Sequence, residues 1–308
     1  MGESDDAALQ EALGELEARV QRALARPSHE QLDVIGVGEI SPVLRLGLGE
    51  RGYAAKRLPR FADAPSLERY VETFDAYRGA LEQVGVHALE SRVLVASRQK
   101  DGLSAYCVQP LLEASTLCVD RLRRMDATTA RSFGGRLFDL VASAVSDRLG
   151  LDAQLSNWFM RSAPDEPPEF GYLDLTTPLM RNEAGEELLD TELFLASLPA
   201  LLRPLVRRFM LRDILANYYD LRSVLRDLLG NLIKESLERH LDGWLGVANA
   251  RITPALTMSE VQAHYADDAR TWALLQRLRK LDRSWQRHVR RRPYGFLLPG
   301  SIERRTDQ

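Results

Sequence analysis

Three side chains in the middle of the sequence have the residue types that magnesium-assisted phosphoryl transfer requires. Asp152 and Asn157 are five residues apart, and Asp174 follows seventeen residues after Asn157. This chemistry needs a carboxylate base, a neutral oxygen ligand and a second carboxylate at one metal site. A chain with 44 acidic residues also places an Asp and an Asn at this separation in ordinary solvated loops, so the interpretation depends on the other motifs.

A glycine-containing turn upstream could hold phosphate groups. Three short apolar runs predict three strands, and the turn between the first two contains Gly36, Gly38 and Ser41. Two glycines allow backbone N–H groups to approach phosphate oxygens, and a lysine on the third strand can reach the same phosphates. Lys56 is the lysine in that position, so we expect it to bind phosphate together with the glycine turn.

Lys56 needs an anionic partner, because its apolar neighbours predict that the third strand is half buried. A helix is predicted over residues 66–84 from apolar residues that recur every three or four positions. Glu72, near the middle of that helix, is the expected partner. Glu68 is an alternative one turn earlier, whereas Glu82 is too near the helix end. Each of these acids could equally be a solvated helix residue.

A second glycine pattern, Gly47 to Gly52, matches G-x-G-x-x-G but does not predict a nucleotide site. A dinucleotide site needs a helix that begins at the third glycine, whereas the next residues predict a strand that ends at Pro59. As a phosphate loop, the pattern would leave too few residues before Lys56 for the intervening strands. We therefore predict a turn between the second and third strands.

The order of these motifs resembles the protein-kinase-like fold superfamily, most closely the branch of aminoglycoside phosphotransferases and choline kinases. The matched motifs cover roughly residues 30–180. The resemblance implies an α+β, two-lobed protein with a small antiparallel-sheet N-lobe and a larger, mainly helical C-lobe, with ATP and Mg²⁺ bound between them. The implied roles are Asp152 as base, Asn157 and Asp174 as magnesium ligands, Lys56 on the phosphates and Glu72 orienting Lys56.

The same resemblance implies where adenine would bind. Residues 105–112 would form the last strand of the N-lobe and the hinge, with the backbone around Gln109 and Leu111 reading the base. Residues 217–222 could line an acceptor pocket, although core packing is the preferred interpretation.

Several positions depart from the pattern of the superfamily. Gly150 and Leu151 precede Asp152, where His-Arg or His-Gly is usual, and Gln154 stands where protein kinases place a lysine. Leu175 follows Asp174 in place of Phe, and no A-P-E segment follows. These departures weaken the protein-kinase interpretation more than the small-molecule one, and they leave a catalytically silent protein open.

The sequence therefore predicts transfer of the γ-phosphoryl group of ATP to a hydroxyl, which we expect on an unidentified small-molecule acceptor. The main alternative is a catalytically silent nucleotide-binding scaffold or regulator. A third interpretation is nucleotidyl transfer in the same pocket.

Composition is that of an ordinary globular protein, with 308 residues, 45% hydrophobic residues and a net charge of -3. There is no run of eighteen apolar residues and the first residues are acidic, so no membrane role is expected. Two cysteines without a disulfide pattern favour the cytoplasm, and five scattered histidines do not indicate zinc.

Three zones are predicted along the chain: an N-terminal amphipathic helix in 1–26, the N-lobe in 27–112 and the C-lobe in 113–308. The last helix is strongly basic, which raises the possibility of a nucleic-acid partner. We expect no nucleic-acid partner, because the chain is slightly acidic overall and the arginines are predicted to lie on the solvent-exposed face of this helix. Its predicted buried stripe consists of Leu274, Leu278, Leu281, Trp285 and Val289.

Overall fold

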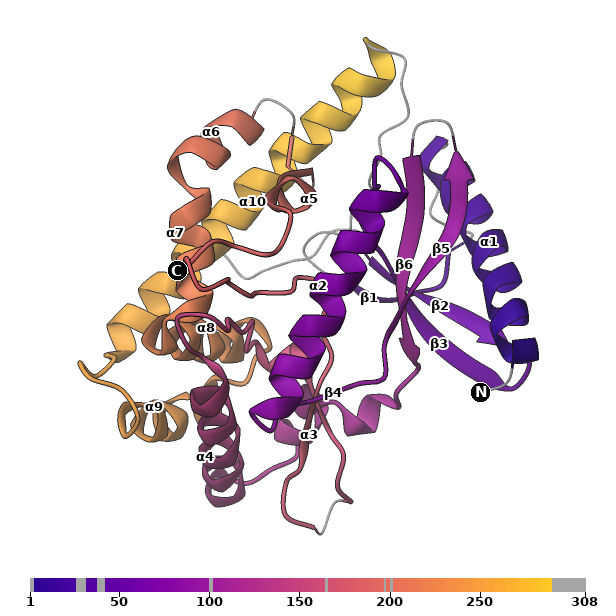
Figure 1. The fold of residues 1–308 in the computed structure, drawn as a ribbon. Coiled ribbons are helices and arrows are strands. Elements are labelled where there is room, and N and C mark those ends of the chain that lie inside the picture. Colours follow the sequence, from indigo (N-terminus) through magenta and orange to yellow (C-terminus); the bar gives the residue numbers. More distant parts are fainter. Residues whose placement is uncertain are drawn as a thin grey trace.

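The protein has two lobes, which are visible at the right and left of Figure 1. This computed structural model describes residues 3–25, 32–37, 42–99, 102–163, 166–196, 198–199 and 202–289. The small lobe contains helices α1 and α2 and a five-stranded sheet, and the large lobe is mainly helical. The expected α+β, two-lobed fold class is confirmed.

The five-stranded sheet has the order β1-β2-β3-β6-β5, and each neighbouring pair is antiparallel. Its strands are β1 (Val34–Val37), β2 (Pro42–Leu48), β3 (Arg51–Arg57), β5 (Arg92–Gln99) and β6 (Gly102–Pro110). The predicted turn between β2 and β3 is present at Gly49, whose φ of +58° is a conformation that favours glycine. Gly47 and Gly52 lie opposite each other in the paired strands.

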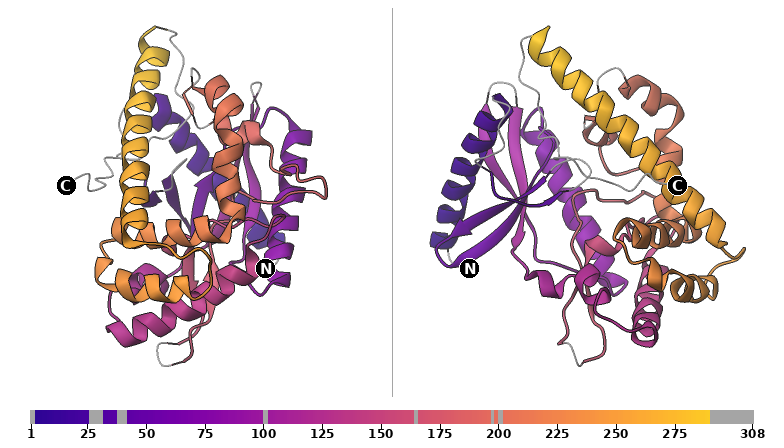
Figure 2. Two further views of the ribbon diagram at one scale, coloured as in Figure 1. Left: turned by 90° about the vertical axis from the view of Figure 1, so that its left-hand side faces the viewer. Right: turned by 180° about the vertical axis from the view of Figure 1, so that it is seen from behind.

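Helix α1 (Glu3–Ala25) covers one face of this sheet (Figure 2). The apolar positions of the predicted N-terminal helix, including Leu13 and Val20, are fully buried against β2, β3 and β6. An ion pair accompanies this packing, since Arg57 Nη2 lies 2.8 Å from Glu17 Oε1, and the two side chains are 6% and 2% exposed. Tyr106 also donates its hydroxyl to Glu17 at 2.6 Å.

Helix α2 (Ala64–Gln83) lies between the sheet and the large lobe (Figure 1). Asp63 caps its first turn by accepting a hydrogen bond from the backbone N–H of Ser66, and the Ser66 hydroxyl accepts one from the N–H of Asp63. The helix buries its predicted apolar face, which consists of Leu67, Tyr70, Phe74, Tyr77 and Leu81.

The large lobe contains helices packed around a three-stranded sheet of order β4-β8-β7. The strands are β4 (His87–Ala88), β7 (Trp158–Met160) and β8 (Phe170–Tyr172). The helices are α3 (Cys118–Leu122), α4 (Ala127–Ala144), α5 (Thr191–Ala196), α6 (Arg203–Phe209), α7 (Leu211–Ala216), α8 (Leu221–Lys234), α9 (Leu241–Asn249) and α10 (Met258–His288). One continuous apolar core joins α2 to these elements.

The predicted buried stripe of the last helix is wrong. In α10, Leu274, Leu281 and Trp285 are 57%, 66% and 56% exposed, and Val289 is 56% exposed. The residues of α10 that are buried are instead Val261, Ala269, Trp272 and Arg279. Helical periodicity identifies an apolar face but not whether another element covers it, which explains the error.

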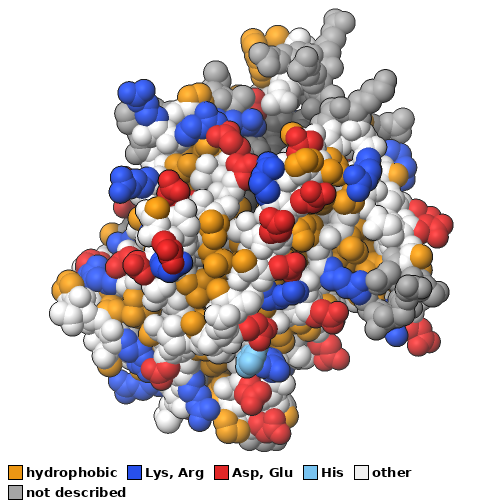
Figure 3. Space-filling model, in the orientation of Figure 1, with side chains coloured by type: hydrophobic (Ala, Val, Ile, Leu, Met, Phe, Trp, Pro, Cys, Tyr) orange, Lys and Arg blue, Asp and Glu red, His pale blue; other side chains and the backbone are white. Residues whose placement is uncertain are grey.

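The surface mixes the two signs of charge. On the face shown in Figure 3, Lys and Arg side chains are interspersed with Asp and Glu side chains. No helix within the described residues combines the length and the apolar character needed to cross a membrane.

The buried pair of Arg57 and Glu17 predicts a large loss of stability when one partner is removed. We expect Arg57→Met to lower the free energy of unfolding by roughly 3–5 kcal/mol, because Glu17 would remain charged without its partner. Arg45→Met removes an exposed pair, in which the side chains of Arg45 and Asp33 are 50% and 60% exposed. It should cost less than about 1 kcal/mol.

Urea unfolding of both variants and of the double variant Glu17→Met/Arg57→Met measures these effects. The double variant should be more stable than Arg57→Met alone. Equal losses in the buried and exposed single variants would contradict the assignment.

Candidate active site

Strands β7 and β8 bring Asn157 and Asp174 together. The two strands form an antiparallel hairpin, with Trp158 opposite Tyr172. Asn157 immediately precedes β7, and its carbonyl accepts a hydrogen bond from the N–H of Leu173 at 2.8 Å. Asp174 follows Leu173, so the predicted carboxamide and carboxylate are at the same end of the hairpin.

Asp152 joins this group through its backbone. Its carbonyl oxygen accepts hydrogen bonds from Asn157 Nδ2 and from the Tyr172 hydroxyl, both at 3.1 Å. Its side-chain Oδ1 accepts a weak bond from the N–H of Gln154 at 3.3 Å. These contacts connect Asp152, Asn157 and the Asp174 segment in one hydrogen-bonded loop, as the spacing in the sequence predicts.

Lys56 crosses from the small lobe to Asp174. Its ammonium nitrogen lies 2.9 Å from Oδ1 and 3.0 Å from Oδ2 of Asp174, and each side chain is 22% exposed. The hydroxyl and the N–H of Thr176 also donate to Asp174 Oδ1, at 2.6 and 3.1 Å. Burial disfavours the ionised carboxylate, but Lys56 and Thr176 outweigh it and hold the pKa of Asp174 below its usual value.

Glu72 is not the partner that the structure gives to Lys56. The Glu72 side chain is exposed on α2, whereas the ammonium pairs with Asp174. The reason lies in the helical period, since Glu72 is two positions from the buried Tyr70 and Phe74 and so lies on the opposite side of the helix. The apolar pattern that predicted the helix already placed this acid away from the core.

Two tyrosines of α2 contact the site instead. The Tyr70 hydroxyl donates to the carbonyl of Thr176, and the Tyr77 hydroxyl donates to the carbonyl of Gly150, each at 3.0 Å. Burial raises the pKa of both hydroxyls above that of a free phenol, so they remain protonated donors. The sequence analysis counted them only as core residues.

The expected phosphate turn is described only in part. Gly36 lies in β1 opposite Val43, while Gly38 and Ser41 fall outside the described residues.

At the expected hinge, Gln109 uses its side chain to connect the lobes, donating to the carbonyl of Leu173 at 2.7 Å and to Ser91 Oγ at 2.9 Å. The backbone N–H of Leu111 donates to the carbonyl of Gly52 at 2.9 Å. In this conformation, a nucleotide base could not take that N–H without replacing the bond to Gly52.

Helix α8 supports the loop of residues 152–157 through side chains that sequence reasoning did not identify. The N–H of Leu155 donates to Asn231 Oδ1 at 2.9 Å, and the ammonium of Lys234 donates to Gln154 Oε1 at 3.0 Å. Asn231 is 3% exposed. A polar residue on the apolar face of an amphipathic helix was the available signal, because such a group needs a buried partner.

Residues 217–222 serve packing and capping, which agrees with the preferred interpretation. Tyr219 is buried and donates its hydroxyl to Glu187 at 2.6 Å. Asp220 caps α8, and the Tyr218 carbonyl accepts a bond from the N–H of Leu151.

The donor set suits magnesium. Asn157 commits its amide nitrogen to the carbonyl of Asp152, so its amide oxygen is the atom that could bind a cation. With an Asp174 carboxylate, this gives the two hard oxygen donors typical of a magnesium site that also uses water and phosphate oxygens. Within the described part of the chain, no group of three or more His, Cys, Asp or Glu residues converges as a metal site.

The lowered pKa of Asp174 predicts a specific dependence on pH. The ion pair stabilises the fold fully above the usual carboxyl pKa of 3.8 and loses its effect as the pH falls through the lower folded value. We expect Lys56→Met to lose roughly 1–3 kcal/mol near neutral pH, because it leaves the carboxylate without its ammonium partner. That deficit should shrink below about pH 4.

Guanidinium unfolding of the wild type and of Lys56→Met across this range measures the deficit. Arg45→Met provides a control for loss of an exposed cation. A deficit for Lys56→Met that is the same at acidic and neutral pH would show that the ion pair is not its cause.

Comparisons with known proteins give a family match and distant likenesses to many solved structures, two of which are described here. A search of curated proteins finds no match. Among solved structures, the chain is similar to WaaP in complex with acyl carrier protein, with 18% identity, a TM-score of 0.34, and 70% of this chain and 89% of that chain covered. It is also similar to the microcompartment-associated aminopropanol kinase, with 13% identity, a TM-score of 0.32, and coverage of 86% and 98%.

Both TM-scores are too low for either likeness to support an argument about the site. The model of DUF6206, a family of unknown function, matches residues 15–283, which is more than half of the chain. The chain therefore belongs to the DUF6206 family.

Proposed function

We propose that this protein is a phosphotransferase that uses ATP and Mg²⁺ to phosphorylate a hydroxyl of a small molecule. The observation that carries the proposal is the ion pair between Lys56 and Asp174, at 2.9 Å, which joins strand β3 of the small-lobe sheet to the segment after β8. Phosphoryl transfer depends on positioning and charge, and it needs a cation for the phosphates and a carboxylate for the metal at one place.

The residues have separate roles in this proposal. Asp174 and Asn157 would hold magnesium, which would supply positive charge to stabilise the phosphate groups. Lys56 would exchange its carboxylate partner for phosphate oxygens when the nucleotide binds. Asp152 would accept the proton of the acceptor hydroxyl, with its backbone fixed by Asn157 and Tyr172.

Lys234 adds a positive charge at the catalytic loop. Its ammonium nitrogen lies 3.0 Å from Oε1 of Gln154. Gln154 is the residue that stands where protein kinases have a lysine. A cation contributed by α8 would stabilise the negative charge on the phosphoryl group in the transition state.

A catalytically silent nucleotide-binding scaffold is the second candidate, and two observations favour it. Glu72 is exposed and does not orient Lys56. The N–H of Leu111 is bonded to the carbonyl of Gly52, which leaves adenine to find another donor. Both candidates require nucleotide binding, and only the first requires a base.

Nucleotide binding is tested by thermal unfolding. We expect magnesium-ATP to raise the melting temperature by mass action, and Lys56→Ala to reduce that shift, because the ammonium would contact the phosphates. Asp174→Asn should remain folded and lose the additional stabilisation that magnesium gives over ATP alone. No shift at millimolar nucleotide would exclude both candidates.

Asp152→Asn separates the enzyme from the scaffold. If Asp152 is the general base, the variant should consume ATP more slowly by about a hundredfold to ten-thousandfold in the presence of a small-molecule metabolite extract. Its affinity for ATP should stay within a few-fold of wild type. Asp147→Asn, outside the catalytic loop, is the matched control. Equal turnover in wild type and Asp152→Asn would reject the role of Asp152.

A further inference from the structure

Helix α10 carries a row of large apolar side chains on its surface, the α10 stripe. Its members are Leu274, Leu278, Leu281, Trp285 and Val289. Four of them are more than half exposed, with Leu281 the most at 66%, and Leu278 is partly exposed. Single apolar residues are common on protein surfaces, whereas a contiguous apolar row marks a surface that another molecule covers.

The α10 stripe points away from the rest of the described protein. Helix α10 packs against α8, and its residues Trp272 and Arg279 are buried. Leu274 and Leu281 each follow one of these buried residues by two positions, which is a rotation of about 200° on an α-helix. The C-terminal end of α10 also extends past the other helices (Figures 1 and 2). A second helix can therefore pack on the stripe without meeting the body of the protein.

The spacing within the stripe is that of a coiled coil. Leu274, Leu278, Leu281 and Trp285 are separated by four, three and four positions, which is the alternation of d and a positions in a heptad repeat. Leu274 and Leu281 take the d positions, where leucine is typical of two-stranded parallel coiled coils. Such a seam is complementary to an identical seam, so a second copy of this chain fits it.

The charges beside the stripe indicate the direction of the pair. Arg277 immediately precedes Leu278 and takes a g position, and Asp282 immediately follows Leu281 and takes an e position. In a parallel pair, a g residue faces the e residue five positions later on the other helix, and Asp282 is five positions after Arg277. Asp282 accepts a hydrogen bond from Gln286 at 3.0 Å, and a carboxylate can accept several. Opposite charges would thus meet on both sides of a parallel seam.

We propose that α10 pairs with the α10 of a second copy of this chain as a short parallel coiled coil. This inference does not depend on the phosphotransferase proposal. The stripe spans about two heptads, which bury less surface than a permanent dimer interface does. The pair is therefore a reversible dimer whose population depends on protein concentration.

Sedimentation equilibrium of the full chain tests the proposal. We expect the mean mass of wild type to rise from that of a monomer towards that of a dimer between about 1 and 200 µM. Leu281→Asp/Trp285→Asp should weaken association by about a hundredfold or more, because it places carboxylates in the apolar seam. Both side chains are exposed in the single chain, so the dilute variant should keep the melting temperature of dilute wild type.

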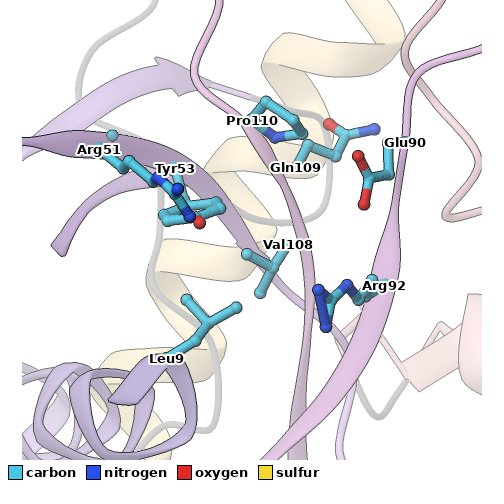
Figure 4. Close-up of a pocket in the computed structure, with 9 residues that line it drawn as sticks. Leu9, Arg51, Tyr53, Glu90, Arg92, Val108, Gln109 and Pro110 are labelled. Carbon is cyan, nitrogen blue, oxygen red and sulfur yellow. The ribbon is translucent and has the colours of Figure 1, made fainter. Parts of the chain in front are cut away.

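Exchange of the flanking charges tests the parallel direction. Arg277→Asp and Asp282→Arg should each weaken self-association by about tenfold, because like charges then face each other across the seam. An equimolar mixture of the two variants should associate at least as well as wild type, since every facing pair again has opposite charges. Glu90→Arg is the matched control, since it changes the net charge as much as Asp282→Arg does. Glu90 is exposed and lines a cavity of the small lobe (Figure 4), so this variant should associate as wild type does.

Three results would overturn the proposal. Wild type that stays monomeric throughout this range would exclude a second copy as the partner, and binding of that monomer to vesicles of anionic phospholipid would assign the stripe to a lipid surface. Association that survives Leu281→Asp/Trp285→Asp would place the interface elsewhere. A mixture of Arg277→Asp and Asp282→Arg that does not recover association would exclude the parallel pair.

Discussion

The ion pair between Lys56 and Asp174 is the contact on which the proposed site depends. Opposite charges that are 22% exposed at a lobe interface attract more strongly than charges in open water, so the pair fixes β3 against the segment after β8. Gln109 and Tyr70 hold the same segment through the carbonyls of Leu173 and Thr176. The small lobe is thus tied to three nearby positions, Leu173, Asp174 and Thr176.

The loop of residues 150–157 is fixed mainly through its backbone. The Asp152 carbonyl accepts two hydrogen bonds, the N–H of Leu155 is bound by Asn231, and the carbonyl of Gly150 is bound by Tyr77. Side chains of α2, α8 and β8, two of them donors and one an acceptor, therefore converge on one short segment. Such support gives a loop the rigidity that positioning of a reacting group requires.

The sequence predicted the elements that depend on local pattern. The strands of the small lobe, α1 and α2 follow from apolar periodicity and turn residues, whereas a shared site for Asp152, Asn157 and Asp174 stays a prediction from their spacing. It could not predict which charged residues meet across the lobes, because that depends on tertiary packing. Glu72 was misplaced although the apolar period of α2 already puts it opposite the buried face. The α10 stripe was misplaced because periodicity does not show whether another element covers an apolar face, while Asn231 and Lys234 carry no motif.

The fate of labelled ATP tests the central claim most directly. Wild type is incubated with magnesium, a metabolite extract and ATP that carries the label in either the γ- or the α-phosphate, and the products are identified by mass. The account predicts that the γ-label, and not the α-label, appears on a small molecule, and that Asp152→Asn abolishes this product. Transfer of the α-label would indicate nucleotidyl transfer, and no labelled product from a protein that binds ATP would contradict the claim of catalysis.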